Sequence, residues 1–205
     1  LLNVLFAGPV SGFHDVVYVD ALSAFLIFIL VFVAFTATVY GIGYFRFELG
    51  KGVITPVQLH RFYLWFHLFV MAMVTVMILN HLALLWIAIE LTTLISALLV
   101  AFYRQARALE AAWKYLIIGS LGIAFALFGI LFLYASGLDV LGDTPGTLNW
   151  TELHEAADKL DPTWVTIAFV FVLVGFGTKA GLAPLHFWLP DAHSEAPSPV
   201  SAILS

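Results

Sequence analysis

Long apolar stretches restrict the fold of this chain more than any other feature of its sequence. A membrane-spanning helix needs about 20 mostly apolar residues to cross about 30 Å of hydrocarbon. Five stretches meet this condition: 20–42, 61–79, 81–103, 110–136 and 163–183, and a sixth apolar run begins near Pro197. Backbone groups in lipid must pair internally, which favours helices over open sheets. We therefore predict an all-α, polytopic transmembrane helix bundle with five full helices and the start of a sixth.

The composition agrees with a bilayer as the solvent. Hydrophobic residues make up 62% of the chain and charged residues only 10%, whereas soluble domains carry about 25% charged residues. Cys is absent, which excludes a disulfide framework, a thiolate metal site and a Cys nucleophile. The histidines lack metal-ligand spacing, and there is neither a nucleotide fingerprint nor a basic patch with interleaved aromatics. We therefore expect no metal, no cofactor and no nucleic acid partner.

Charged residues outside the apolar stretches alternate between the two ends of the predicted bundle. The basic connections contain Arg46, Lys51, Arg61, Arg104 and Arg107. The segment before Asp20 has no Lys or Arg, and the 137–162 connection has six acidic residues against the single Lys159. By the positive-inside rule, the basic end faces the cytoplasm. We predict an inner (cell) membrane protein of bacteria or archaea, with the N-terminal segment and the 137–162 loop outside.

Two connections carry more specific predictions. The second and third apolar stretches meet at a tight Asn80–His81 connection, so these helices should form an antiparallel hairpin. Residues 151–160 have apolar side chains at helical spacing, which predicts a short surface helix. Its apolar positions are Leu153, Ala156, Ala157 and Leu160. We interpret this acidic loop as a solvated connector in preference to an external ligand site.

Glu90 is an acidic residue within the third apolar stretch. Along a helix it lies about 15 Å from Asn80 and about 21 Å from Arg104, near the middle of the membrane. An ionisable group there costs roughly 2.5–3.5 kcal/mol on insertion scales and normally faces a protein or water-filled interior. Thr93 and Ala97 share its helix face. We favour a function in proton transfer over a hydrogen bond that only joins two helices.

Lys179 lies in a segment that disfavours a regular helix. Gly175, Gly177 and Gly181 loosen the backbone, and Pro184 cannot donate a hydrogen bond to the carbonyl of Ala180. We predict a broken helix near 175–190, with freed carbonyls that could solvate a passing ion. A Lys in such a place can exchange protons; the alternative is that its side chain extends to the nearby interface.

Lys114 and His186 are weaker candidates from position alone. Lys114 stands seven residues beyond Arg107, about 10 Å along a helix, so it could also reach the interface. His186 follows Lys179 by seven residues, and a His titrates near neutrality, which suits a proton relay. A single interfacial His is nevertheless more often an ordinary polar anchor.

The segment Lys179–His193 and the residues that follow it, to Ala202, resemble a known family. They are similar to the proton-translocating, antiporter-like membrane subunits of respiratory complex I and of the Mrp-type multisubunit Na+/H+ antiporters, and look closest to the F component of hydrogenase-4-type complexes. The segments Ala88–Leu94 and Ala112–Ser120 are similar to the same group. The Lys-to-His segment is specific for the superfamily and much less so for the subgroup.

The resemblance implies that residues 1–205 form a single transmembrane domain, the first of two inverted five-helix repeats of a longer chain. Glu90 matches the family's fifth-helix Glu, Lys114 a sixth-helix Lys, and Lys179 the Lys of the broken seventh helix. His186 falls within the broken-helix motif. In the family, such ionisable groups pass protons towards the middle of the membrane, so we assign proton translocation to Glu90, Lys114, Lys179 and His186.

The leading hypothesis is a proton-translocating subunit of a multisubunit energy-converting oxidoreductase of the hydrogenase-4 or NADH:quinone oxidoreductase type. Other membrane subunits would be its partners and would hold the redox chemistry, with no catalysis by this chain alone. Glu90 and Lys114 would form a charge pair, and Lys179 would accept a proton when that pair opens. The alternatives are a subunit of a Na+/H+ antiporter or of an inorganic-carbon uptake complex, and a purely structural membrane anchor.

Overall fold

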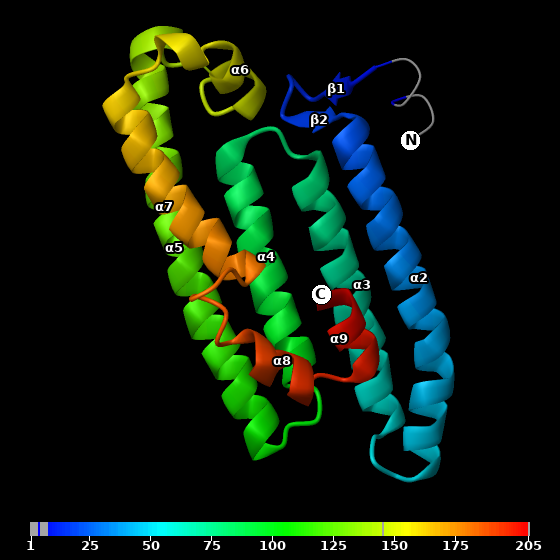
Figure 1. Cartoon of the computed structure of the whole chain (residues 1–205). Helices are drawn as coiled ribbons and strands as arrows, with labels where there is room; N and C mark the ends of the chain where they lie inside the picture. Colours follow the sequence, from blue (N-terminus) through cyan, green and yellow to red (C-terminus); the bar gives the residue numbers. More distant parts are fainter. Residues whose placement is uncertain (1–3, 5–7, 145, 205) are drawn as a thin grey trace.

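The computed structural model describes residue 4 and residues 8–144 and 146–204. Among these residues, five helices are long and apolar enough to cross a membrane (Figure 1). They are α2 (Ala21–Gly50), α3 (Pro56–Ile78), α4 (Leu82–Val100), α5 (Ala106–Leu141) and α7 (Pro162–Ala180). The predicted all-α polytopic bundle is confirmed.

Helices α2, α3 and α5 extend beyond the predicted apolar stretches, and for two of them packing or capping accounts for the extension. Helix α2 runs to Gly50, and its Phe45 is only 1% exposed, with its ring 4.3 Å from the ring of Phe62 on α3. Helix α3 begins five residues before the predicted start because Thr55 and Gln58 form a capping box at its N-terminus. Tertiary contacts and a cap, rather than hydropathy, therefore set these ends.

The helices are arranged as a row of neighbours with one closely packed pair. Helices α2, α3, α4 and α5 contact one another in sequence order, and α7 packs along α5 (Figure 1). The predicted antiparallel hairpin of α3 and α4 is present around Asn80 and His81. Glycines permit the close approach of α5 and α7: a Cβ atom on Gly129 would lie 2.9 Å from the carbonyl oxygen of Ala168.

Asn80 joins the connections at one end of the bundle. Its side chain is fully buried, and its Nδ2 donates to the Asp15 carbonyl at 2.8 Å and to Thr151 Oγ1 at 2.8 Å. Asp15 belongs to the turn between strands β1 (Val10–Gly12) and β2 (Val17–Val19), an antiparallel pair that was not predicted. The N-terminal segment and the acidic loop therefore lie at the same end, away from the α2–α3 and α4–α5 connections.

The acidic loop contains the predicted short helix in two pieces. Helix α6 spans Trp150–Glu155 and the 3-10 helix η1 spans Ala157–Lys159. Leu153, Ala156 and Leu160 are buried as expected, whereas Ala157 is exposed because the change from α to 3-10 geometry rotates the helix face.

The predicted break near 175–190 is present. Helix α7 ends at Ala180, Gly181 adopts a left-handed conformation with φ of 74°, and helical structure resumes with α8 (Leu189–Glu195). Trp188 holds the connecting segment in place: its indole N–H donates to the Thr178 carbonyl at 2.9 Å. Helix α9 (Ser198–Leu204) then begins where the sixth apolar run was expected.

Candidate functional site

Lys179 occupies the last turn of α7 and points towards α4 and α5 rather than to the end of the bundle. Its Nζ donates to Thr93 Oγ1 at 2.9 Å and to the Tyr115 hydroxyl at 2.6 Å. Among the residues that the structure describes, no carboxylate lies within ion-pair distance of Lys179. The ammonium group is therefore held by neutral oxygens, and its side chain does not extend to the interface.

The hydroxyl groups around Lys179 have defined donor directions. Ser96 Oγ donates to the Thr92 carbonyl at 2.6 Å, so it accepts from the Tyr115 hydroxyl at 2.7 Å. Tyr115 in turn uses an oxygen lone pair to accept from Lys179. The bonds run from Lys179 through Tyr115 and Ser96 to a main-chain carbonyl, and Tyr115 is 1% exposed. This series of hydrogen bonds between side chains fixes the orientation of the Lys179 ammonium group.

Glu90 lies one helical turn before Thr93 on α4 and faces α5. Its Oε1 accepts a hydrogen bond from Ser120 Oγ at 2.6 Å. Its Oε2 is buried and has no hydrogen-bond partner within the described residues. One turn of helix corresponds to about 5 Å, so the Glu90 carboxyl group stands next to the hydroxyl network that holds Lys179.

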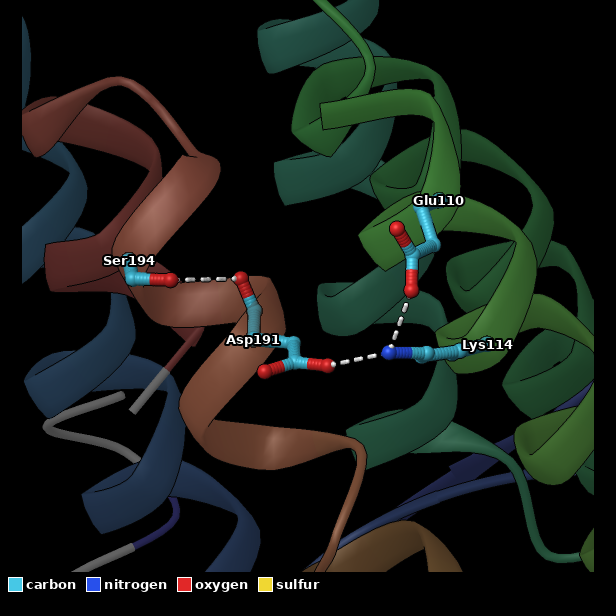
Figure 2. A network of polar contacts seen from close by, with 4 residues as sticks. All are labelled: Glu110, Lys114, Asp191 and Ser194. Carbon is cyan, nitrogen blue, oxygen red and sulfur yellow. Dashed lines mark hydrogen bonds and ion pairs between the residues drawn. The ribbon is translucent and has the colours of Figure 1, made fainter. Parts of the chain in front are cut away.

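Lys114 is not where the sequence placed it, and the predicted Glu90–Lys114 pair is wrong for this structure. Its Nζ lies 2.7 Å from Glu110 Oε1 on α5 and 3.0 Å from Asp191 Oδ2 on α8 (Figure 2). The Lys114 side chain is 48% exposed. Ser120, which does bond Glu90, follows Lys114 by six residues and so projects from a different face of α5. Lys114 instead fastens α8 to α5.

His186 lies in the exposed connection between α7 and α8. No hydrogen bond joins its side chain to the Lys179 network within the part of the chain that the structure describes. The structure thus brings Lys179 and Glu90 together and leaves Lys114 and His186 outside that group. The proton-transfer roles of all four residues stay predictions.

The hydroxyl residues around the site were not predicted as functional. Ser96, Tyr115 and Ser120 lie in apolar stretches, where single small polar residues do not stand out. The one available signal was helical spacing, because Thr93 lies three residues after Glu90 and shares its face of α4. The Tyr115 contact depends on how α5 is rotated against α4, which spacing within one helix does not reveal.

Residues 79–205, which contain all four predicted site residues, match the family model described as NADH:quinone oxidoreductase/Mrp antiporter, TM. The chain belongs to this family. It is therefore an integral membrane protein, and the resemblance drawn from its Lys-to-His segment is confirmed.

Relatives and solved structures agree with this assignment. A hydrogenase-4 component F homolog from Methylacidiphilum infernorum is 40% identical over 187 residues, which cover 91% of this chain and 39% of that protein. A chain of respiratory complex I from Thermus thermophilus has a TM-score of 0.71 and 25% identity, covering 99% of this chain and 42% of that one. A chain of the membrane-bound sulfane sulfur reductase, an archaeal respiratory complex, shares the fold, with a TM-score of 0.76, 24% identity and coverages of 97% and 37%. The chain spans about two-fifths of the length of these proteins.

Proposed function

We propose that this chain is the proton-translocating part of a membrane subunit in a multisubunit energy-converting oxidoreductase of the hydrogenase-4 or NADH:quinone oxidoreductase type. The observation that carries the proposal is the position of Lys179, held by Thr93 and Tyr115 one helical turn from the buried carboxyl group of Glu90. Redox chemistry belongs to partner subunits in this proposal. Residues 1–205 act as one transmembrane domain, the first antiporter-like repeat of a longer chain.

The hydroxyl groups around Lys179 suit both of its protonation states. The ammonium form donates to Thr93 and Tyr115. The neutral amine has a lone pair, and the Tyr115 hydroxyl can rotate from Ser96 to donate to it. Loss of the proton therefore leaves no polar group unpaired, which keeps the cost of each transfer low.

Glu90 supplies the electrostatic control in this mechanism. A carboxylate near an ammonium group favours the charged form of that group. When Glu90 takes up a proton, Lys179 loses this electrostatic stabilisation of its ammonium form. A proton that arrives at Glu90 thus promotes release from Lys179.

Lys114 and His186 retain proposed roles at the margin of this site. Lys114 is a mobile cation that can exchange Asp191 for other partners, because both groups of that pair are about half exposed. His186 lies on the exposed break between α7 and α8 and can relay protons to the region beyond α7. Both roles rest on the family resemblance together with these positions.

The proposed orientation places the end with Arg46, Arg61 and Arg104 in the cytoplasm and the N-terminal segment and 137–162 loop outside. The support is the distribution of basic residues, five of which lie in or next to the connections at that end. We place the protein in the inner (cell) membrane of a bacterium or archaeon. A cysteine introduced at Lys159, labelled from outside intact cells, tests this orientation.

The test of the function uses the full-length subunit in its complex, reconstituted in vesicles. We expect Glu90→Gln and Lys179→Ala each to abolish redox-driven proton uptake, because each removes one of the two charges that exchange the proton. Glu155→Gln and Lys159→Ala are matched controls, since they make the same changes at exposed positions of the acidic loop. If both the Glu90 and the Lys179 variants pump protons at the wild-type rate, the proposed mechanism is ruled out.

A subunit of a Na+/H+ antiporter is the second candidate, because the matching family description includes Mrp antiporters. The same vesicles distinguish the two functions. Redox-driven proton uptake that persists in sodium-free buffer supports the first proposal, whereas proton movement that requires sodium and proceeds without an electron donor supports the second.

A further inference from the structure

A cavity of about 360 Å³ opens at the basic end of the bundle, outside the Lys179 site. It lies between the first turns of α3, the connection that follows α4 and the first turn of α5. Six of the residues that line it are Gln58, Arg61, Trp65, Leu98, Phe102 and Arg104. No residue of the proposed proton path takes part in it.

Two arginines from separate elements face this cavity without an acidic partner. Arg61 lies on α3 and Arg104 in the α4–α5 connection, and both are exposed. Within the described residues, the ion pairs are those of Lys114 with Glu110 and Asp191, so neither arginine is neutralised. No Asp or Glu lines the cavity. Two guanidinium groups with free N–H donors match the oxygens of a phosphate group.

A second cavity at the same end differs from the first because it contains acidic as well as basic residues. It has a volume of about 210 Å³ and contains Arg107 and Lys114, but Glu110, Asp191 and Glu195 also line it. Acidic groups there offset the basic ones. Unbalanced positive charge is therefore a property of the Arg61–Arg104 cavity and not of every hollow at the basic end.

The remaining wall of the cavity is apolar and continues towards the membrane interior. Trp65 follows Arg61 by one helical turn along α3, and Leu98 precedes the α4–α5 connection by about one turn on α4. A Trp ring at this level favours the boundary between head groups and acyl chains. A phosphate ion alone would use the arginines and leave this wall without a partner.

We propose that this cavity binds an anionic phospholipid, with its phosphate on Arg61 and Arg104 and an acyl chain along Trp65 and Leu98. Basic pockets between membrane helices on the cytoplasmic side are suited to anionic head groups. The excess of Lys and Arg at this end raises the local concentration of such lipids. The inference does not depend on proton transport.

The experiment uses the full-length subunit in its complex, in nanodiscs that contain phosphatidylglycerol and phosphatidylcholine. Lipid retained after detergent extraction is measured by native mass spectrometry. We expect Arg61→Gln and Arg104→Gln each to lower the preference for phosphatidylglycerol about fivefold, the effect of one surface arginine. Arg46→Gln, at the same end but outside the cavity, should leave the preference unchanged. Leu98→Trp, which fills the apolar part, should lower phosphatidylglycerol retention without any loss of charge.

Three outcomes would overturn the proposal. The first is wild-type retention of phosphatidylglycerol when both cavity arginines are changed. The second is an equal loss in Arg46→Gln, which would show general attraction to the basic end. The third is displacement of the lipid by millimolar inorganic phosphate together with no effect of Leu98→Trp, which would identify a site for free phosphate.

Discussion

Removing the hydroxyl group of Tyr115 tests whether the neutral network around Lys179 controls its proton. Tyr115→Phe keeps the ring, which packs 4.8 Å from the ring of Trp188, and removes bonds to Lys179 and Ser96. A hydrogen bond to a charged group contributes about 1.5–3 kcal/mol and one between neutral groups about 1 kcal/mol. The ammonium form therefore loses about 0.5–2 kcal/mol more than the amine form.

This difference converts into a shift of the pH–rate profile. At about 1.36 kcal/mol per pH unit, it corresponds to roughly 0.4–1.5 units. The sign follows from the chemistry: the Tyr115 hydroxyl accepts a hydrogen bond from the ammonium group, so the variant stabilises the charged form less. We expect the alkaline fall in proton pumping by reconstituted full-length complex to move to lower pH by this amount.

Tyr134→Phe is the matched control, because Tyr134 is on the same helix and its hydroxyl bonds Asp143 at the acidic end. Its pH profile should equal that of the wild type. If Tyr115→Phe and Tyr134→Phe give the same unshifted profile, the reasoning that assigns Lys179 to the proton path through Tyr115 is refuted.

Three further predictions concern stability and ionisation. Asn80→Ala should lower the free energy of unfolding by about 2–3 kcal/mol, measured by chemical denaturation in detergent, because buried polar groups of two connections lose partners. Gly129→Val should destabilise the protein by about 1–3 kcal/mol by overpacking α5 against α7, whereas Gly43→Ala, which meets open space, should not. Burial and the bond to Glu48 raise the pKa of Tyr103 above its ordinary value, so the folded state holds this proton more tightly. Its stabilising contribution is present below about pH 10 and is lost above it; Tyr103→Phe should reduce the alkaline loss of stability, and an unchanged alkaline transition would contradict this.

The sequence predicted the transmembrane architecture well because hydrocarbon imposes a simple rule on length and polarity. Five spans, the hairpin at Asn80 and the break after Lys179 all follow from apolar runs and from glycine and proline positions. The end of α2 was missed because the burial of Phe45 depends on its neighbours. The β1–β2 pair was missed because its strands contain only three residues each.

The candidate site was predicted less completely, and the reason is the rotation of one helix against another. Glu90 and Lys179 were identified because charge in an apolar stretch is visible in the sequence. Glu90 bonds to Ser120 and Lys179 bonds to Tyr115 because of the face that α5 turns towards α4. The same rotation directs Lys114 to Asp191. The resemblance of Lys114 to a family position does not indicate this partner.

The break after α7 bears on which ion can travel through this region. The sequence predicted that Pro184 frees the carbonyl of Ala180. The two carbonyl oxygens just before it are engaged: that of Gly177 accepts from Leu182 N–H at 2.9 Å, and that of Thr178 accepts from the indole N–H of Trp188 at 2.9 Å. A sodium ion must exchange its hydration water for several protein oxygens at once. With the Gly177 and Thr178 oxygens engaged, a dehydrated alkali cation beside Lys179 would have to take its oxygen ligands from other groups, whereas a proton needs only one lone pair at a time. The end of α7 therefore offers fewer open main-chain oxygens than its glycines and proline alone would suggest.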